Sequence, residues 1–253
     1  MIIGLALSGG GAKGIAHAGL IKYLKEKNIK IRAVSGTSSG ALVAALFAAG
    51  NDAEKIYEFF KTPNLFDVKK YAFGRPGLIR SEVFEAHIKK YILEDSFESL
   101  KIPLKITAVN INSTKLKVFS QGELYKPLLA SAAFPGLFTP VVIDDETYVD
   151  GGVINNFPVD LLDDCDYRIG CYVNQVEKLG SKSLKRSYDV AGRAYAISQY
   201  SKDASKFHLA DVLVEPQELY HYGLFSFKSL ERMMELGYQA ATISLKDEST
   251  FLK

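Results

Sequence analysis

The 253-residue sequence is poor in cysteine, in net charge and in long apolar runs, and each shortage excludes a class of protein. The only two cysteines, Cys165 and Cys171, are too few for a disulfide scaffold, and they lack the neighbouring residues that complete a zinc site. Because both flank a predicted strand, we expect two buried, reduced thiols. The net charge of +2 leaves no basic excess, which excludes a dedicated nucleic-acid-binding protein.

No apolar run in the sequence is long enough to cross a membrane. The longest, around residues 41–49, falls far short of the roughly 20 residues that span a bilayer. Residues 1–11 are apolar, but no basic segment precedes them and glycines interrupt them, so they predict a first strand rather than a signal peptide. We therefore expect a cytoplasmic protein, in which any contact with a membrane is transient and confined to its surface.

The first part of the chain alternates between β-rich and helical patterns. Residues 2–7 predict a strand, residues 8–14 a glycine-rich loop and residues 15–27 a helix, and a second strand starts at Ile31. Such a βαβ unit implies parallel strands with helices on the faces of the sheet. No low-complexity linker or internal repeat interrupts the sequence. We therefore predict one domain over residues 1–253, a three-layer α/β/α fold with a mainly parallel central sheet.

The rest of the chain continues the same alternation. Further helices are predicted over residues 52–61, 81–93, 125–133, 158–162 and 226–245, and a long helix within residues 183–209. Further strands are predicted over residues 104–111, 116–120, 141–143, 147–149, 167–173 and 211–214.

A strand, a tight turn and a helix follow one another in residues 31–50. The turn contains Gly36, Ser38 and Gly40 in Gly-x-Ser-x-Gly spacing, the pattern that exposes a serine hydroxyl on a sharp bend. A side chain at either glycine would clash where the strand and the helix approach closely. We predict that Ser38 is a nucleophile, with the backbone N–H of Ser39 directed at the reacting carbonyl oxygen.

A second glycine-marked turn lies between the first strand and the first helix. Gly9, Gly11 and Gly14 match the dinucleotide-binding pattern, but residues 35–37 contain no acid at the place where that pattern expects one. Lys13 is not followed by Ser or Thr, which excludes a Walker loop. The sequence thus argues against nucleotide binding at this turn.

The glycines of this turn suit another purpose better. We predict that the bare backbone N–H groups of Gly9, Gly10 and Gly11 stabilise negative charge on a carbonyl oxygen, as acyl transfer requires. Adjacent parallel strands would place this turn and the Ser38 turn side by side at one edge of the sheet. Three roles of Lys13 stay open, because it could hold the loop, attract an anionic head group or be a solvated loop lysine.

A serine nucleophile needs a base, and histidine is the usual one. His17 and His87 fall on helix patterns and are predicted to be structural. His208 and His221 follow Asp150 in the chain, so either one satisfies the order of a Ser-Asp-His triad. Neither of these two histidines lies in a recognisable motif.

Asp150 has a more distinctive setting than any histidine. It comes after a predicted hairpin strand and before Gly151 and Gly152, which lets a carboxylate project into a site without crowding. The same setting also suits a turn aspartate that accepts local backbone hydrogen bonds. A triad, an aspartate base and a turn aspartate therefore remain open on these residues alone.

Four segments, taken together and in this order, resemble the bacterial patatin-like phospholipases. They are GGGAKG at residues 9–14, GTSSG at 36–40, SAAFPGLFTP at 131–140 and DGG at 150–152. The resemblance covers roughly residues 1–160, whereas residues 161–253 match no motif of the family and complete the same predicted domain.

The resemblance implies a Ser–Asp dyad and resolves the choice of base. Ser38 is then the nucleophile, Asp150 the proton acceptor, and the glycine loop with Ser39 the oxyanion hole. No histidine, metal or cofactor is needed in this scheme. The remaining motif residues would support the geometry: Lys13, Gly14, Gly36, Gly40, Gly151 and Gly152.

The expected activity is hydrolysis of lipid or other carboxylic esters through an acyl-enzyme at Ser38. Lipase, phospholipase, lysophospholipase and thioesterase activities all agree with the resemblance. Two alternatives are a non-catalytic lipid- or acyl-binding regulator on the same scaffold and a Ser-Asp-His triad esterase. The intact pair of Ser38 and Asp150 separates the hydrolase from the regulator.

Residues 63–80 mix aromatic, basic, glycine and proline residues without clean periodicity. This pattern predicts a mobile loop or flap. Its larger side chains could touch a lipid interface, or they could cover the core instead. They are Phe66, Lys69, Lys70, Tyr71, Phe73 and Arg75.

Overall fold

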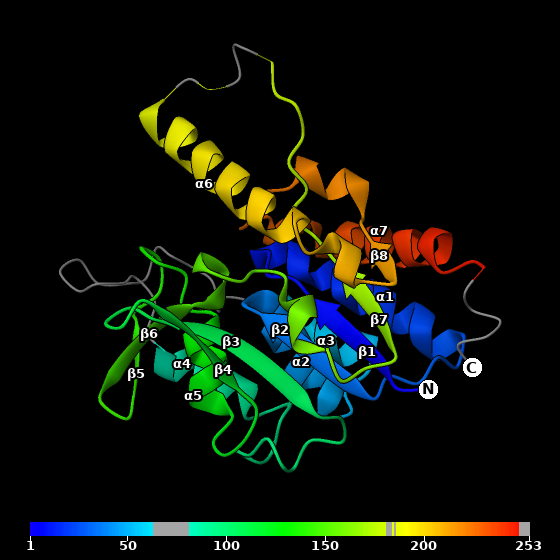
Figure 1. Ribbon diagram of the computed structural model, residues 1–253, viewed down its shortest axis with the longest axis horizontal. Coiled ribbons are helices and arrows are strands. Elements are labelled where there is room, and N and C mark those ends of the chain that lie inside the picture. The colour runs from blue at the N-terminus through cyan, green and yellow to red at the C-terminus, as the bar shows by residue number, and fades with distance from the viewer. Residues whose placement is uncertain (63–80, 181–183, 185, 248–253) are drawn as a thin grey trace.

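The computed structural model describes residues 1–62, 81–180, 184 and 186–247 (Figure 1). The predicted flap over residues 63–80, with the six side chains named for it, lies outside the described residues.

A central sheet of eight strands runs through the described part of the chain. Five strands are parallel: β1 (Ile3–Leu7), β2 (Ala33–Thr37), β3 (Leu104–Asn110), β7 (Tyr167–Cys171) and β8 (Val212–Val214). Three run antiparallel to their neighbours: β4 (Lys115–Phe119), β5 (Val141–Ile143) and β6 (Glu146–Asp150). The order is β5-β6-β3-β2-β1-β7-β8, with β4 also paired to β3. The predicted α/β fold with a mainly parallel sheet is confirmed.

Alternation along the strands gives the sheet two buried faces. Leu5 and Leu7 of β1 belong to the larger core, and Ala6 between them belongs to a smaller one. The larger core includes side chains of α1 (Ala16–Glu26), α2 (Ser39–Ala48), α3 (Ala53–Lys61), α4 (Ser81–Ile88), α5 (Tyr125–Ser131) and α7 (Leu230–Ser244).

The opposite face of the sheet is covered more thinly. Phe157 and Tyr172 form its buried cluster together with side chains that follow β6 and β7. Tyr200, from the C-terminal part of α6 (Ser187–Ala204), packs on this cluster, as does Phe207 from the 3-10 turn η5 (Phe207–Leu209). α6 lies within the range 183–209 in which the sequence predicts a long helix, and a separate 3-10 turn forms the last part of that range.

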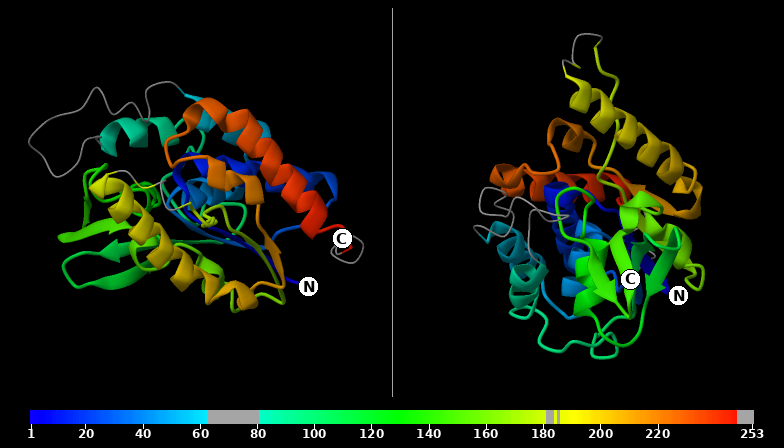
Figure 2. Two further views of the ribbon diagram at one scale, coloured as in Figure 1. Left: turned by 90° about the horizontal axis from the view of Figure 1, so that it is seen from above. Right: turned by 90° about the vertical axis from the view of Figure 1, so that its left-hand side faces the viewer.

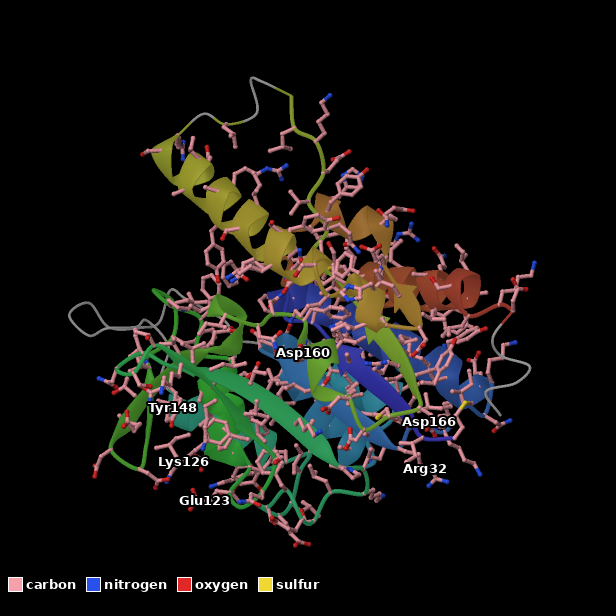
Figure 3. The ribbon with its side chains drawn as sticks, viewed as in Figure 1. Arg32, Glu123, Lys126, Tyr148, Asp160 and Asp166 are labelled. Carbon is pink, nitrogen blue, oxygen red and sulfur yellow. The ribbon has the colours of Figure 1, made fainter. Side chains whose placement is uncertain are left out.

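Charged side chains lie mainly at the periphery of the molecule. Figure 3 shows Arg32, Glu123, Lys126 and Asp166 near the rim of the view, whereas Asp160 lies over its middle. Asp160 Oδ1 forms an ion pair with Lys206 Nζ at 3.1 Å, so the negative charge of this carboxylate is balanced by a neighbouring ammonium group.

The C-terminal helix α7 packs against α1, and the two helices lie side by side (Figures 1 and 2). Gly19 of α1 and Gly237 of α7 allow this close approach. A Cβ atom on Gly237 would overlap the carbonyl oxygen of Ala16, and one on Gly19 would overlap that of Met234. The last part of the chain is thereby fixed to the first.

We expect Gly237→Ala to lower the free energy of unfolding by about 1 to 3 kcal/mol, because backbone atoms of α1 must move to admit the methyl group. The control is Gly192→Ala in α6, where no atom lies within 4 Å of the new Cβ. That variant should gain up to about 1 kcal/mol from helix propensity. Urea unfolding of both variants measures the difference, and equal effects would contradict the close-packing interpretation.

Candidate active site

Ser38 occupies a strained elbow between β2 and α2. Its backbone has φ 54° and ψ −126°, a conformation that residues other than glycine rarely adopt. Its N–H donates to Ser131 Oγ at 2.9 Å, which holds the bend. A Cβ on Gly40 would overlap the carbonyl oxygen of Leu7, so helix α2 can start this close to β1 only with glycine there.

The sheet register brings Asp150 to Ser38. β4 pairs along one edge of β3, so β2 and β6 divide the opposite edge between them. Thr37 at the end of β2 faces Thr107, and Asp150 at the end of β6 faces the next residue, Ala108. Because β2 and β6 run toward each other along this edge, their C-terminal ends meet.

The Ser38 hydroxyl donates a hydrogen bond to the Asp150 carboxylate, and the Gly152 N–H donates another to Oδ1 at 2.7 Å. Asp150 is only 3% exposed. Burial raises its pKa to about 6, while the two hydrogen bonds act in the opposite direction. The group is thus mostly ionised at neutral pH, yet basic enough to take up a proton.

The glycine loop offers fewer donors than the three predicted. The N–H of Gly9 donates to the carbonyl oxygen of Asn156 at 3.1 Å, so it is already engaged. The N–H groups of Gly10 and Gly11 have no partner among the described residues. Gly10, Gly11 and Ser39 line the same cavity as Ser38. Of the four predicted oxyanion donors, Gly9 is therefore removed, and Gly10, Gly11 and Ser39 remain as candidates.

Lys13 is buried at the base of the glycine loop, with 7% of its surface exposed, and it lines the cavity. The interpretation as a solvated loop lysine is therefore wrong. Burial lowers its pKa to about 8, so part of the population is neutral near physiological pH. An anion bound nearby would restore the charged form.

The remaining motif glycines fit elements closely together. A Cβ on Gly14 would lie 2.5 Å from Ser39 Oγ, and one on Gly36 would lie 2.7 Å from the Ala41 backbone. Gly151 packs in the same way on the backbone of Thr107. These three glycines allow the elements around the site to pack closely but do not line the cavity, whereas Gly152 does line it.

A cavity of about 390 Å³ opens over Ser38 and Asp150. Its apolar lining includes side chains from α2, α3 and α4 and from the segment after α5: Leu42, Phe60, Phe84, Phe134, Leu137 and Phe138. Further apolar side chains come from the segment after β8: Tyr222, Leu224, Phe225 and Phe227. Its polar lining includes Asn156 after β6, Asn174 and Gln175 after β7, and Arg193 and Gln199 from α6. One apolar chain and one polar group could both be accommodated here.

None of the four histidines lines this cavity. His17 is fully buried and its Nε2 donates to the Ser8 carbonyl at 2.8 Å, while burial lowers its pKa to about 4. His87 is buried against the Phe59 carbonyl. Neither His208 nor His221 lines the cavity. The arrangement brings a serine and an aspartate together without an imidazole.

Two residues of the site had no role in the sequence prediction. Ser131 holds the backbone of Ser38, although the sequence marks it only as the first residue of the SAAFPGLFTP motif. Asn156 lines the cavity and accepts from the glycine loop. Its only signal is a position shortly after Asp150, before Pro158. Among the described residues, no group of three or more His, Cys, Asp or Glu side chains could hold a metal ion.

A family model described as patatin-like phospholipase matches residues 5–163. Lysophospholipase NTE1 of Mycosarcoma maydis is 32% identical over 177 residues, covering 64% of this chain and 9% of the relative. An uncharacterized NTE family protein of Mycobacterium tuberculosis is 29% identical over 159 residues, covering 62% and 44%. Human patatin-like phospholipase domain-containing protein 6 is 29% identical over 167 residues, covering 63% and 12%. The chain thus spans less than half the length of each of these relatives.

Solved structures with the same fold extend the likeness beyond the matched segment. VipD from Legionella pneumophila gives a TM-score of 0.52 at 14% identity and covers 96% of this chain and 66% of its own. ExoU of Pseudomonas aeruginosa, in its heterodimeric complex with SpcU, gives 0.51 at 18% identity and covers 98% and 52%. Across the described residues, no helix has the length and apolar character needed to span a membrane.

Proposed function

Because the chain belongs to the patatin-like phospholipase family, we propose that it is a serine acyl hydrolase that cleaves carboxylic ester bonds of lipids or related acyl compounds. The observation that carries the proposal is the hydrogen bond from the Ser38 hydroxyl to the buried Asp150 carboxylate, inside a cavity with an apolar lining.

In the proposed mechanism, Ser38 Oγ attacks the ester carbonyl and its proton passes to Asp150. The N–H groups of Gly10, Gly11 and Ser39 stabilise the oxyanion. Collapse of this intermediate breaks the ester C–O bond, and the alcohol leaves with the proton from Asp150. Asp150 then takes a proton from water, and the resulting hydroxide attacks the acyl-enzyme. As the bond between the acyl carbon and Ser38 Oγ breaks, Asp150 returns the proton to Ser38 Oγ and the carboxylic acid is released.

The lining of the cavity supports a lipid substrate. Phe60, Phe84 and Phe138 suit an acyl chain, and Lys13 with Arg193 suits an anionic head group. Lysophospholipids are the first class to test, since a similar protein is named a lysophospholipase. The test is a panel of lysophospholipids, phospholipids, triglycerides and acyl thioesters, with Ser38→Ala as the blank. Equal turnover by both proteins across the panel would refute the proposal.

A binding protein without activity would keep the same cavity, so the two functions need separating. A fluorophosphonate probe should label the wild-type protein covalently at Ser38, because it requires an activated serine hydroxyl. Binding of a fluorescent fatty acid without any labelling would instead favour the regulator.

We further propose that residues 1–253 fold as one domain and act in the cytoplasm. The packing of α7 on α1 supports the first statement. The second is supported by Cys165 and Cys171, which are both free and buried, as expected for reduced thiols.

Transient contact with a lipid surface is also part of the proposal. The N-terminal half of α6 projects from the body of the molecule (Figures 1 and 2). The outward side of α6 carries Val190, Ala194 and Ile197 at helical spacing, all exposed, while Gly192 and Gln199 on the other side of the helix line the cavity. An apolar stripe at the rim of a lipid-binding cavity suits insertion into an interface.

We expect Val190→Ser combined with Ile197→Ser to reduce cosedimentation with phospholipid vesicles about tenfold, because two apolar side chains no longer leave water. Hydrolysis of a short, soluble ester should be unchanged. The matched control is Ile243→Ser on α7, which replaces an apolar side chain that is 78% exposed. Equal loss of vesicle binding in the control would contradict a specific docking surface.

A further inference from the structure

The segment after Asp150 has little regular structure, yet its backbone is satisfied by side chains from both sides. From β2, Thr37 Oγ1 donates to the carbonyl of Asn155 at 2.9 Å, and Ser35 Oγ donates to that of Pro158 at 2.8 Å. From α6, the Gln199 amide donates to the carbonyl of Gly152. The segment is thus held between β2, the strand that leads into Ser38, and a helix outside the matched family segment.

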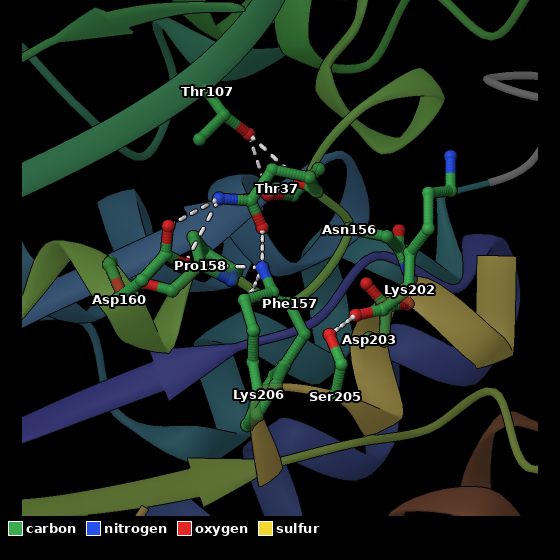
Figure 4. A network of polar contacts seen from close by, with 12 residues as sticks. Thr37, Thr107, Asn156, Phe157, Pro158, Asp160, Lys202, Asp203, Ser205 and Lys206 are labelled. Atoms are coloured by element: carbon green, nitrogen blue, oxygen red, sulfur yellow. Dashed lines mark hydrogen bonds and ion pairs between the residues drawn. The ribbon is translucent and has the colours of Figure 1, made fainter. Parts of the chain in front are cut away.

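The C-terminal end of α6 and the turn that follows it supply further contacts to the same segment (Figure 4). Lys202 Nζ donates to the Val153 carbonyl at 2.8 Å, and Lys206 Nζ donates to the Phe157 carbonyl at 2.7 Å. Gln199, Lys202 and Asp203 lie on one side of the helix because residues three and four apart share a face. This side of α6 is consequently polar although it is turned inward.

Asp203 is the residue on this face that contacts Asn156, which lines the active-site cavity. It is fully buried, and its Oδ2 accepts from Asn156 Nδ2 at 3.3 Å and from the Tyr172 hydroxyl at 3.2 Å. Because a carboxylate only accepts hydrogen bonds, it fixes the Asn156 amide with its nitrogen toward α6. The other end of that amide, Oδ1, is then directed at the two glycine turns.

Asn156 touches both halves of the site. A Cβ on Gly9 would overlap Asn156 Oδ1, and one on Gly152 would lie 3.0 Å from it and 3.0 Å from Asp150 Oδ1. The backbone carbonyl oxygen of Asn156 also accepts a hydrogen bond from the Gly9 N–H. The side chain is therefore wedged between the glycine loop and the Asp150 turn, and any rotation of its amide shifts one relative to the other.

We infer that Asp203 is a positioning residue of the active site, which acts through Asn156 to hold the glycine loop and the Asp150 turn in fixed relation. The inference rests on the proposed function, since its consequence is the alignment of the oxyanion donors with Asp150. Misplacement of catalytic groups by about 1 Å typically costs on the order of 100-fold in rate.

The test is a double-mutant cycle with kcat and KM for a soluble p-nitrophenyl ester. Asn156→Ala and Asp203→Ala should each lower kcat by about 10- to 100-fold and leave KM within about twofold. The double variant should lose no more than the larger single loss, because both changes remove one linkage. Asp203→Asn should recover most of the activity, since its carboxamide oxygen still accepts from Asn156, and it also avoids the risk that alanine prevents folding.

Tyr172→Phe is the matched control. It removes the other hydrogen bond to the same oxygen of Asp203 without contacting Asn156, so kcat should stay within about twofold of the wild type even where thermal stability falls. Multiplicative losses in the cycle, or an unimpaired Asn156→Ala, would overturn the inference while the proposed function stands. A wild-type protein without Ser38-dependent hydrolysis would overturn both.

Discussion

Ser38→Ala is expected to lower kcat for ester hydrolysis by a factor of about 10⁴ or more, because the covalent route through an acyl-enzyme is lost entirely. Any residual rate would come from water attacking a carbonyl that the Gly10, Gly11 and Ser39 N–H groups still polarise. Fluorophosphonate labelling should disappear in the same variant. Steady-state kinetics and mass spectrometry of the labelled protein measure the two effects.

The strained backbone of Ser38 provides a second readout that a surface serine would not show. With φ at 54°, any side chain costs conformational energy at this position, and glycine does not. Ser38→Gly should therefore be as inactive as Ser38→Ala but more stable than it by about 1 kcal/mol. Retained hydrolysis in either variant would remove Ser38 from the role of nucleophile.

The elbow could be predicted from sequence because its requirements are local. Gly36, Ser38 and Gly40 lie within five residues, and the flanking strand and helix are visible as apolar periodicity. The glycine loop is predictable for the same reason. Which of its N–H groups is engaged depends on Asn156, which is distant in sequence, so the role of Gly9 could not be predicted.

The partner of Ser38 depends on long-range pairing. Asp150 reaches the nucleophile only because β6 continues the edge of β3 where β2 stops, and no local pattern encodes that register. The family resemblance supplied the pairing in place of a physical derivation. The polar face of α6 could not be predicted either, because Gln199, Lys202 and Asp203 have the composition of a solvated helix surface. In the structure, Gln199 and Asp203 are buried and bind the segment after Asp150.

Asp150→Asn is expected to lower kcat by about 10²- to 10⁴-fold, since an amide cannot accept the proton of Ser38. In the wild type, kcat/KM should rise with pH and level off above about pH 6, the pKa of the buried carboxyl. Below that pH the rate should fall about tenfold per pH unit, because only the ionised form acts as base. An unchanged acid limb in the residual activity of the variant would show that another group titrates.

The same carboxyl should make the wild type less stable than Asp150→Asn near neutral pH. Burial raises the pKa of Asp150 from 3.8 to about 6, so the folded protein holds this proton more tightly than the unfolded chain. Stability is therefore lost as the pH rises through this range, and above pH 6 the ionised group costs about 3 kcal/mol.

Because other carboxyl groups are common to both proteins, the difference between their free energies of unfolding isolates Asp150. It should be smallest below pH 4 and grow in favour of the variant until about pH 6. A constant difference across this range would mean that burial does not set the basicity of Asp150. A growing one would show that the protein keeps a destabilising charge at the position where the proposed chemistry needs a base.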